Sequence, residues 1–265
     1  MWPLSYEFMG VLALGAMWVN AVLIALDTGG RWAALGRLFR EMRRAAKSGH
    51  LFKAQVVVGH GDGGVFARRE VKQIGRAMTV PGPRRILFTD KATRIEIMGG
   101  EVEVPGRGRL VVKPEEGATL WCELKPQWGD ANAFEAAWPQ ASTFRGYDTK
   151  VERWVRAGEE VWVWLVGPPS KGIARARLVS TTDPFPVLRR ARLPLIGAAL
   201  ASIGGAAVVT ILALWPPLFG PVSTLGGALG LAFFLGIQPV GAFARDAGRL
   251  PDQQPVGGVW QQSVG

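Results

Sequence analysis

Few residues of this chain combine the types and the spacing that chemistry requires, and most of those lie beside glycine. The segment that most resembles a ligand site is residues 59–64, Gly-His-Gly-Asp-Gly-Gly. Glycines can bring backbone N–H groups close to a phosphate, but no Lys-Ser or Lys-Thr pair follows this segment and no helical pattern opens after it. We therefore interpret residues 59–64 as a turn between two strands. His50 and His60 are the only histidines, too few for a metal site without carboxylates at a recognisable spacing.

Two pairs of adjacent acids, Glu115-Glu116 and Glu159-Glu160, could do acid–base work if a pocket moved their pKa values apart. Each pair adjoins a glycine, which favours solvated charges in turns. The single cysteine, Cys122, allows neither an intramolecular disulfide nor a multi-cysteine metal site. We predict no catalytic, metal or cofactor residues and expect no enzyme; a membrane-anchored enzyme that uses the acidic pairs is the least supported alternative.

Charged and apolar residues are segregated along the chain. Of 265 residues, 48% are hydrophobic, and the net charge is +10. Residues 193–244 contain no Asp, Glu, Lys or Arg, whereas residues 31–192 are densely charged. This segregation predicts membrane-spanning segments joined to a water-soluble domain.

Three segments are long and apolar enough to span a bilayer, which takes about 20 residues of helix. The first, residues 8–26 within an N-terminal region 1–30, has no Lys or Arg before it, so we interpret it as a retained anchor. The other two, residues 193–214 and 221–240, form a helical hairpin within residues 189–244. Small residues recur at four-residue spacing and are predicted to pack helix against helix, unless they only reflect abundant glycine: Gly197, Ala201, Gly205, Gly226 and Gly230.

The orientation follows from the basic residues, which are retained on the cytoplasmic side. Residues 1–7 and the turn at 215–220 contain no Lys or Arg. We therefore predict an N-terminus outside, with the soluble domain and the C-terminus in the cytoplasm, and we expect a bacterial inner membrane. Basic residues directly beside the spans favour anionic lipid headgroups over nucleic acid as the partner; they are Arg37, Arg40, Arg43, Arg44, Lys47, Arg189, Arg190 and Arg192.

The soluble part has two patterns. Residues 31–49 place apolar side chains at helical spacing among arginines, which predicts a basic amphipathic juxtamembrane helix lying in the headgroup layer, packed on the soluble domain, or both. Residues 50–188 change to short alternating runs separated by glycine and proline, with a helical interruption near 130–138. We predict a mainly-β domain, a small barrel or sandwich, so that the chain combines membrane helices with an α+β soluble domain. Residues 245–265 are predicted to be a flexible C-terminal tail.

Tryptophan is abundant, and three tryptophans of the β-rich region are conspicuous: Trp154, Trp162 and Trp164. Trp162 and Trp164 point to the same side of their predicted strand. They could belong to the core, to a ligand platform or to a belt at the membrane interface, and the pattern leaves all three open.

The order of parts and one segment resemble the GIDE-type family, whose membrane-anchored ubiquitin ligases hold a "beside-a-membrane" domain between two spans. Residues 150–163, Lys-Val-Glu-Arg-Trp-Val-Arg-Ala-Gly-Glu-Glu-Val-Trp-Val, resemble that domain's glutamate, Gly-Glu and hydrophobic strand. Residues 178–181 and 188–192 resemble its strand, serine and arginine-rich entry to the second helix. The chain lacks the Cys and His residues of a RING domain after its hairpin and adds a third span. The resemblance therefore implies a membrane-adjacent binding domain without ubiquitin transfer.

The function predicted from the sequence is a non-enzymatic membrane protein that presents a β-rich binding or scaffold domain beside the cytoplasmic face of the membrane. Its expected partners are anionic lipids and either another protein or a second copy of itself, and not nucleic acid. The alternative is an accessory subunit of a larger membrane complex that docks through its helical hairpin.

Overall fold

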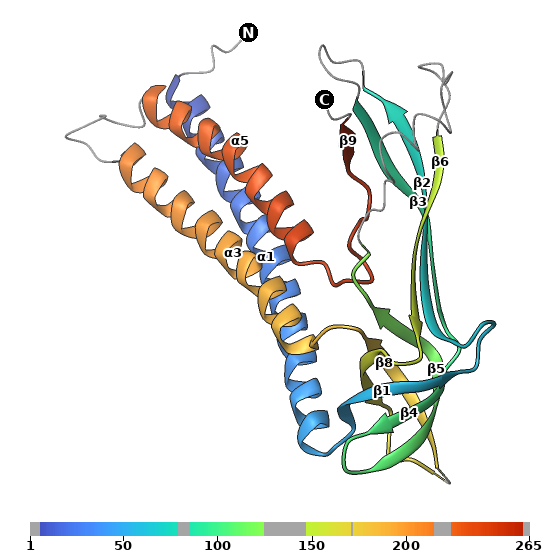
Figure 1. Cartoon of the computed structure of the whole chain (residues 1–265). Helices are drawn as coiled ribbons and strands as arrows, with labels where there is room; N and C mark the ends of the chain where they lie inside the picture. Colours follow the sequence, from blue (N-terminus) through green and yellow to red (C-terminus); the bar gives the residue numbers. More distant parts are fainter. Residues whose placement is uncertain (1–5, 79–84, 125–146, 171, 215–223, 262–265) are drawn as a thin grey trace. The chain divides into compact units, whose positions relative to one another are not determined.

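The computed structural model describes residues 6–78, 85–124, 147–170, 172–214 and 224–261 (Figure 1). The chain divides into two units. The helical unit comprises Met1–Glu41 and Phe185–Leu250, and the β unit comprises Met42–Pro184 and Pro251–Gly265.

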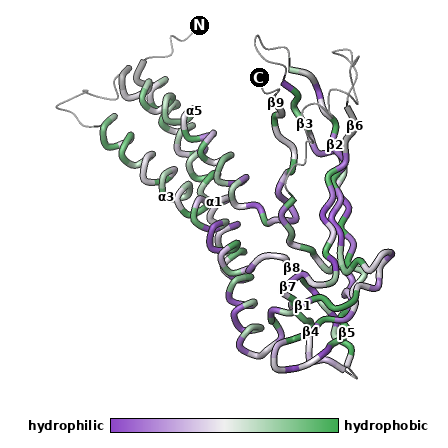
Figure 2. Tube along the Cα trace, in the orientation of Figure 1, coloured by the Kyte–Doolittle hydropathy of each residue, from purple (hydrophilic) through white to green (hydrophobic). Residues whose placement is uncertain are grey.

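Three helices carry the apolar segments: α1 (Tyr6–Lys47), α3 (Pro184–Leu214) and α5 (Thr224–Ala247). Each is long and apolar enough to cross a membrane. Figure 2 shows apolar residues along most of α3 and α5 and along the first half of α1. The predicted first span and the predicted juxtamembrane helix are one continuous helix, Tyr6–Lys47, although residues 27–30, Asp-Thr-Gly-Gly, are of types common at helix ends.

Helix α5 runs parallel to α1. A Cβ atom added at Gly230 would lie 3.1 Å from Leu14, and one added at Gly241 would lie 3.1 Å from Ile24. The step from Leu14 to Ile24 on α1 thus matches the step from Gly230 to Gly241 on α5, so both helices run in the same direction. Close approach at glycines is how helices pack where lipid supplies no hydrophobic effect between them.

Helix α3 runs antiparallel to α1. The indole N–H of Trp18 donates to the Thr210 hydroxyl at 2.8 Å, and the guanidinium carbon of Arg192 lies 4.7 Å from the centre of the Trp32 ring. Residue numbers therefore increase along α1 in the direction in which they decrease along α3. The charged ends of all three helices consequently meet at one end of the helical unit.

The β unit contains a closed five-stranded barrel and a four-stranded sheet, which together with the three long apolar helices confirms the predicted fold class. The barrel strands, in spatial order, are β1 (Leu51–Gly59), β4 (Gly100–Val104), β5 (Gly108–Trp121), β8 (Ile173–Ser180) and β7 (Glu160–Leu165). The sheet strands are β6 (Tyr147–Arg156), β2 (Val65–Ala77), β3 (Arg85–Ile97) and β9 (Val259–Gln261). All neighbours pair antiparallel except β5 and β8.

The barrel core follows from alternation along each strand. On β7, Val161, Val163 and Leu165 belong to the buried core cluster, and the residues between them do not. Some strands are longer than the short alternating runs of the sequence suggest: β3 has 13 residues and β5 has 14. The helical interruption predicted near 130–138 lies outside the described residues.

Residues 60–64 form the predicted turn between β1 and β2, and Gly59 is the last residue of β1. The Gly61 N–H donates to the Val65 carbonyl at 2.9 Å, and the Gly64 N–H donates to the Gly61 carbonyl at 3.0 Å. Gly63 and Gly64 have φ values of 68° and 73°, which glycine adopts without a Cβ clash.

The segment after α5 completes the β unit. Strand β9 pairs with β3, and Asp90 accepts a hydrogen bond from the Val256 N–H at 2.7 Å. Arg69, only 2% exposed, donates to the main-chain carbonyls of four residues: Cys122, Pro251, Asp252 and Gln254. Residues 251–261 therefore differ from the flexible tail predicted at 245–265, because a buried cation and a sheet edge supply hydrogen bonds that composition does not reveal.

Candidate lipid-binding site at the basic end of the helical unit

Small residues set how closely the helices approach. A Cβ atom at Gly205 would lie 2.4 Å from the Phe233 ring, and one at Gly226 would lie 2.9 Å from the Ala213 Cβ. Gly205 and Gly226 thus lie where α3 meets α5, and Gly230 lies where α5 meets α1.

Two other residues predicted to pack lie elsewhere. Nothing is within 4 Å of a Cβ added at Gly197, and Ala201 is exposed. The buried stripe of α3 is displaced by one residue and keeps the four-residue spacing: Ala198, Ser202 and Ala206. The four-residue spacing could be predicted from the sequence, but several overlapping sets of small residues on α3 have this spacing, so the sequence does not indicate which set is buried.

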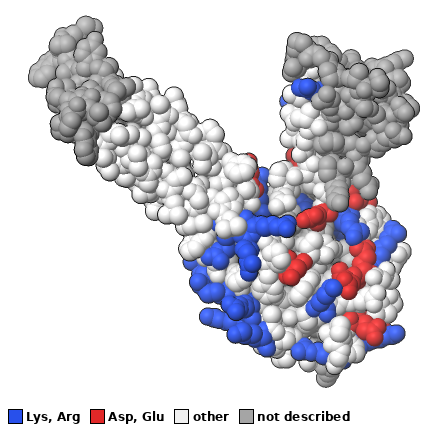
Figure 3. Space-filling model, turned by 60° about the vertical axis from the view of Figure 1, so that its left-hand side comes forward, with Lys and Arg blue, Asp and Glu red and all other residues white. Residues whose placement is uncertain are grey.

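Because α3 runs antiparallel to α1 and α5 runs parallel to it, the basic residues of the three helices lie at the same end of the helical unit (Figure 3). Arg245 of α5 lies 3.8 Å from Asp27 of α1, and Arg192 of α3 lies on Trp32 of α1. Seven of the eight predicted headgroup residues have exposed side chains: Arg37, Arg40, Arg43, Arg44, Lys47, Arg189 and Arg190. The eighth, Arg192, is partly buried between α1 and α3.

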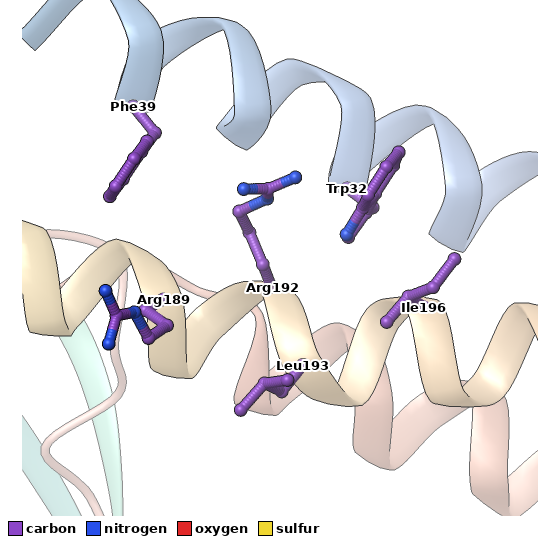
Figure 4. A pocket seen from close by; sticks show the side chains of 6 residues that line it. All are labelled: Trp32, Phe39, Arg189, Arg192, Leu193 and Ile196. Atoms are coloured by element: carbon purple, nitrogen blue, oxygen red, sulfur yellow. The ribbon is translucent and has the colours of Figure 1, made fainter. Parts of the chain in front are cut away.

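A cavity of about 190 Å³ opens between α1 and α3 at this end. We call it the α1–α3 groove; it is lined by Trp32, Phe39, Arg189, Arg192, Leu193 and Ile196 (Figure 4). The helical spacing of the aromatic residues on α1 places two of them on one face, and the first arginines of α3 fall opposite. The groove thus combines two guanidinium groups with aromatic and aliphatic walls.

Arg192 is the central residue of this groove. Its side chain reaches from α3 toward α1 and lies between Phe39 and Trp32 (Figure 4). Its guanidinium stacks on the Trp32 ring, an arrangement that the negative ring face stabilises. Gly36 makes the approach possible, because a Cβ there would lie 3.1 Å from Arg192 Nη2.

One donor of Arg192 lacks an acceptor. Its Nε is buried and has no hydrogen-bond partner among the described residues. A buried donor without a partner costs free energy, so the site favours a ligand that brings an acceptor. A phosphate oxygen suits this donor, since guanidinium binds phosphate by charge-assisted hydrogen bonds.

Three of the four glutamates of the adjacent acidic pairs, which we interpret as solvated turn charges, are engaged in ion pairs of the β unit. Glu159 accepts hydrogen bonds from the Arg153 side chain and, at 3.1 Å, from the Arg156 N–H. Glu160 lies 2.7 Å from the Lys53 ammonium, and Glu115 lies 3.6 Å from an Arg175 nitrogen. These glutamates thus belong to separate local contacts of the barrel and sheet.

Neither histidine joins such a group. His50 Nδ1 lies 2.9 Å from the Ser48 hydroxyl, and His60 lies in the turn after β1. Within the described ranges, no three His, Cys, Asp or Glu side chains are placed to hold a metal ion. Burial raises the pKa of the Cys122 thiol, which disfavours its reactive thiolate.

The tryptophans of β7 do not belong to the barrel-core cluster, although Trp164 is buried, with 8% of its surface exposed. Trp162 and Trp164 alternate with the core residues of that strand, and the Arg177 guanidinium lies 5.0 Å from the centre of the Trp164 ring. Trp154 of β6 donates to Glu152 at 2.5 Å and lies 5.1 Å from the Arg156 guanidinium. Trp154 and Trp164 are thus held by residues of the β unit itself.

Two features escaped the sequence analysis. Gly36 lies between Trp32 and Phe39 on the same face of α1. A small residue between two aromatic residues of one helix face indicates that another side chain approaches closely there. Arg69 lies between Ala67 and Val71 on the inward face of β2, and a lone arginine in an apolar alternation signals a buried cation.

Comparisons with protein-family models, with curated proteins and with solved structures find no match for this chain.

Proposed function

We propose that this chain is a non-enzymatic integral membrane protein that holds its β unit on the cytoplasmic face of a membrane, and that its anchor binds anionic phospholipid in the α1–α3 groove. The observation that carries the proposal is the unpartnered, buried Nε of Arg192 in a groove with apolar walls. The chain has three helices long and apolar enough to cross a membrane, and a β-barrel domain. The placement of these parts relative to the bilayer is the inference.

The gathering of basic residues at one end supports this orientation. Lys and Arg beside a span remain in the cytoplasm, where the inner leaflet is anionic. At that end, a phosphate would lie between Arg189 and Arg192, and its acyl chain would follow Leu193 and Ile196. The guanidinium groups supply charge-assisted hydrogen bonds, and the aliphatic wall excludes water from them.

A partner for the β unit is the second part of the proposal. The resemblance of residues 150–163 to the membrane-adjacent domain of GIDE-type ligases supports a binding role, and the strand β7 in this segment turns Trp162 and Trp164 away from the barrel core. Trp162 is only partly buried there, whereas Trp164 is buried, and a partly exposed tryptophan on an outer strand face is suited to protein contact.

The orientation is tested by cysteine labelling in intact cells with a membrane-impermeant maleimide. The background is Cys122→Ala, which removes the native thiol. We expect Glu116→Cys, exposed in β5, to react only after the cells are permeabilised, and Ser5→Cys to react in intact cells. The reverse pattern, or labelling of both positions from outside, would contradict the orientation.

Lipid binding is tested on the purified full-length protein by native mass spectrometry with added phosphatidylglycerol. We expect Arg192→Gln to lower retention of this lipid about tenfold, as the loss of a charge-assisted hydrogen bond would. The matched control is Arg40→Gln, which removes the same charge from an exposed position of α1 outside the groove. Equal losses in both variants would show general charge attraction and would remove the groove from the proposal.

A further inference from the structure

A second cavity lies on another face of α1, between α1 and α5. Its volume is about 450 Å³, and its lining differs from that of the α1–α3 groove because polar side chains predominate. We call it the α1–α5 pocket; it is lined by Asn20, Leu23, Ile24, Asp27, Arg31, Gln238 and Arg245.

A carboxylate and two guanidinium groups lie at the charged end of this pocket. Arg31 Nε donates to Asp27 Oδ1 at 3.0 Å, and Arg245 Nε lies 3.8 Å from Asp27 Oδ2. The side chains of Asp27, Arg31 and Arg245 remain 40%, 51% and 49% exposed. The contact at 3.8 Å is too long for a hydrogen bond, so Asp27 Oδ2 keeps capacity to accept one.

The pocket extends from this charged end into the apolar part of the helices. Asn20 and Arg31 are eleven residues apart, which is about 16 Å along a helix axis. One leaflet of the hydrocarbon core is about 15 Å thick. The aliphatic wall at Leu23 and Ile24 lies between the two ends, and at the deep end Asn20 Nδ2 donates to the Phe234 carbonyl at 3.2 Å.

We infer that the α1–α5 pocket binds phosphatidylethanolamine, with the lipid phosphate on Arg31 and Arg245 and its ammonium group on Asp27. A phosphate alone would meet the Asp27 carboxylate as a like charge. A headgroup that carries a cation next to its phosphate complements both signs, and a primary ammonium donates the hydrogen bonds that Asp27 can accept. The acyl chain then lies along Leu23 and Ile24.

The placement of this pocket in one leaflet depends on the membrane orientation proposed above, but its ligand differs from that of the α1–α3 groove. Phosphatidylglycerol lacks the ammonium group, and phosphatidylcholine carries a quaternary ammonium without an N–H donor. The three lipids thus separate recognition of the ammonium from attraction to phosphate and from non-selective filling by acyl chains.

The test is native mass spectrometry of the full-length protein with an equimolar mixture of the three lipids. We expect the wild-type protein to retain phosphatidylethanolamine at least as well as phosphatidylglycerol and well above phosphatidylcholine. Asp27→Asn and Arg245→Gln should each lower phosphatidylethanolamine retention about tenfold. Arg109→Gln, the same charge loss at an exposed position of β5 outside the pocket, should leave it unchanged.

Asp27 and Arg245 also link two helices, so a variant that blocks the pocket without breaking the ion pairs is needed. Leu23→Trp meets this need, since Leu23 lines the pocket, is 61% exposed and makes none of the ion pairs. We expect it to displace phosphatidylethanolamine while the protein resists carbonate extraction like the wild type. Unchanged phosphatidylethanolamine retention in Leu23→Trp, or equal retention of phosphatidylcholine, would overturn the inference. Failure of the α1–α3 groove would appear separately, as no effect of Arg192→Gln on phosphatidylglycerol.

Discussion

Asp252 is a carboxyl group in an unfavourable environment. Burial raises its pKa above the ordinary value of 3.8, and hydrogen bonds from the main-chain N–H groups of Asp252 and Gln253, together with the charge of the nearby Arg69 guanidinium, offset this only in part. Its Oδ1 is buried without a hydrogen-bond partner among the described residues. Ionised Asp252 therefore destabilises the β unit, whereas its main-chain carbonyl, which Arg69 binds, is needed.

The sign of the pH dependence follows from this raised pKa. The folded state binds the Asp252 proton more tightly than the unfolded state, so the associated stability is present below the unfolded pKa and is lost as the pH rises through the folded pKa. We expect Asp252→Asn to raise the melting temperature of the β unit at pH 7 by about 2–4 °C, the shift that about 1 kcal/mol produces at this size. Near pH 3 the advantage should disappear.

Thermal unfolding in detergent, followed by tryptophan fluorescence at both pH values, measures this effect. Asp62→Asn, in the exposed turn after β1, is the control that should leave the melting temperature unchanged at either pH. An Asp252→Asn variant that is no more stable than the wild type at pH 7 would contradict the prediction.

Individual residues were the hardest part of this molecule to predict. The basic residues beside the spans were identifiable because their neighbours in sequence are apolar. The role of Arg192 was not predictable, because its side chain packs against Trp32 and Gly36, which lie more than 150 residues earlier in the sequence. Its buried Nε, which has no acceptor, results from this packing. Asp27 and Arg245 likewise meet only because α1 and α5 are parallel.

At the scale of elements, the contact between α3 and α5 depends on the absence of a side chain at Gly205. We expect Gly205→Leu to destabilise the helical unit by about 1–3 kcal/mol, as overpacking does. The reason is the Phe233 ring, which lies 2.4 Å from the position of the new Cβ. Thermal aggregation in detergent, monitored by size-exclusion chromatography, measures the loss.

Gly197→Leu is the matched control on the same helix. Nothing lies within 4 Å of its Cβ position, so the additional side chain enters open space. Equal destabilisation by both variants would indicate a general intolerance of bulk in α3, and the specific contact with Phe233 would be contradicted.

Secondary structure was more predictable than packing. The three helices, the mainly-β domain and the turn at 59–64 follow from hydropathy, alternation and glycine, which act locally. The closure of the barrel through the parallel pairing of β5 with β8 cannot be predicted in this way. Residues 111–121 pair with residues 173–180, and β6 and β7 lie between these two segments in the sequence. The choice between barrel and sandwich was left open for the same reason.

At the scale of the whole molecule, Arg69 links the segment after the last apolar helix to the β unit. We expect Arg69→Met to lower the stability of the tail by about 3 kcal/mol or more, because several hydrogen bonds from a charged group are lost together. Trypsin should then cleave after Arg249 faster in the variant than in the wild type. Intact mass spectrometry of timed digests measures the rate.

Arg68→Met is the control for this experiment. Arg68 precedes Arg69 on β2 but forms an ion pair with Glu96, 2.6 Å away, and makes none of the four carbonyl contacts. Cleavage that is equally fast in both variants would contradict a specific role for Arg69.

The completion of the four-stranded sheet by β9 has a consequence for biosynthesis. Residues 259–261 leave the ribosome only after α5 has been made. Until then, the edge of β3 at residues 85–87 lacks its native neighbour, and Arg69 lacks three of its four carbonyl acceptors. A nascent chain that stopped before residue 251 would keep that edge open, and this difference lets a quality-control protease distinguish finished from unfinished copies.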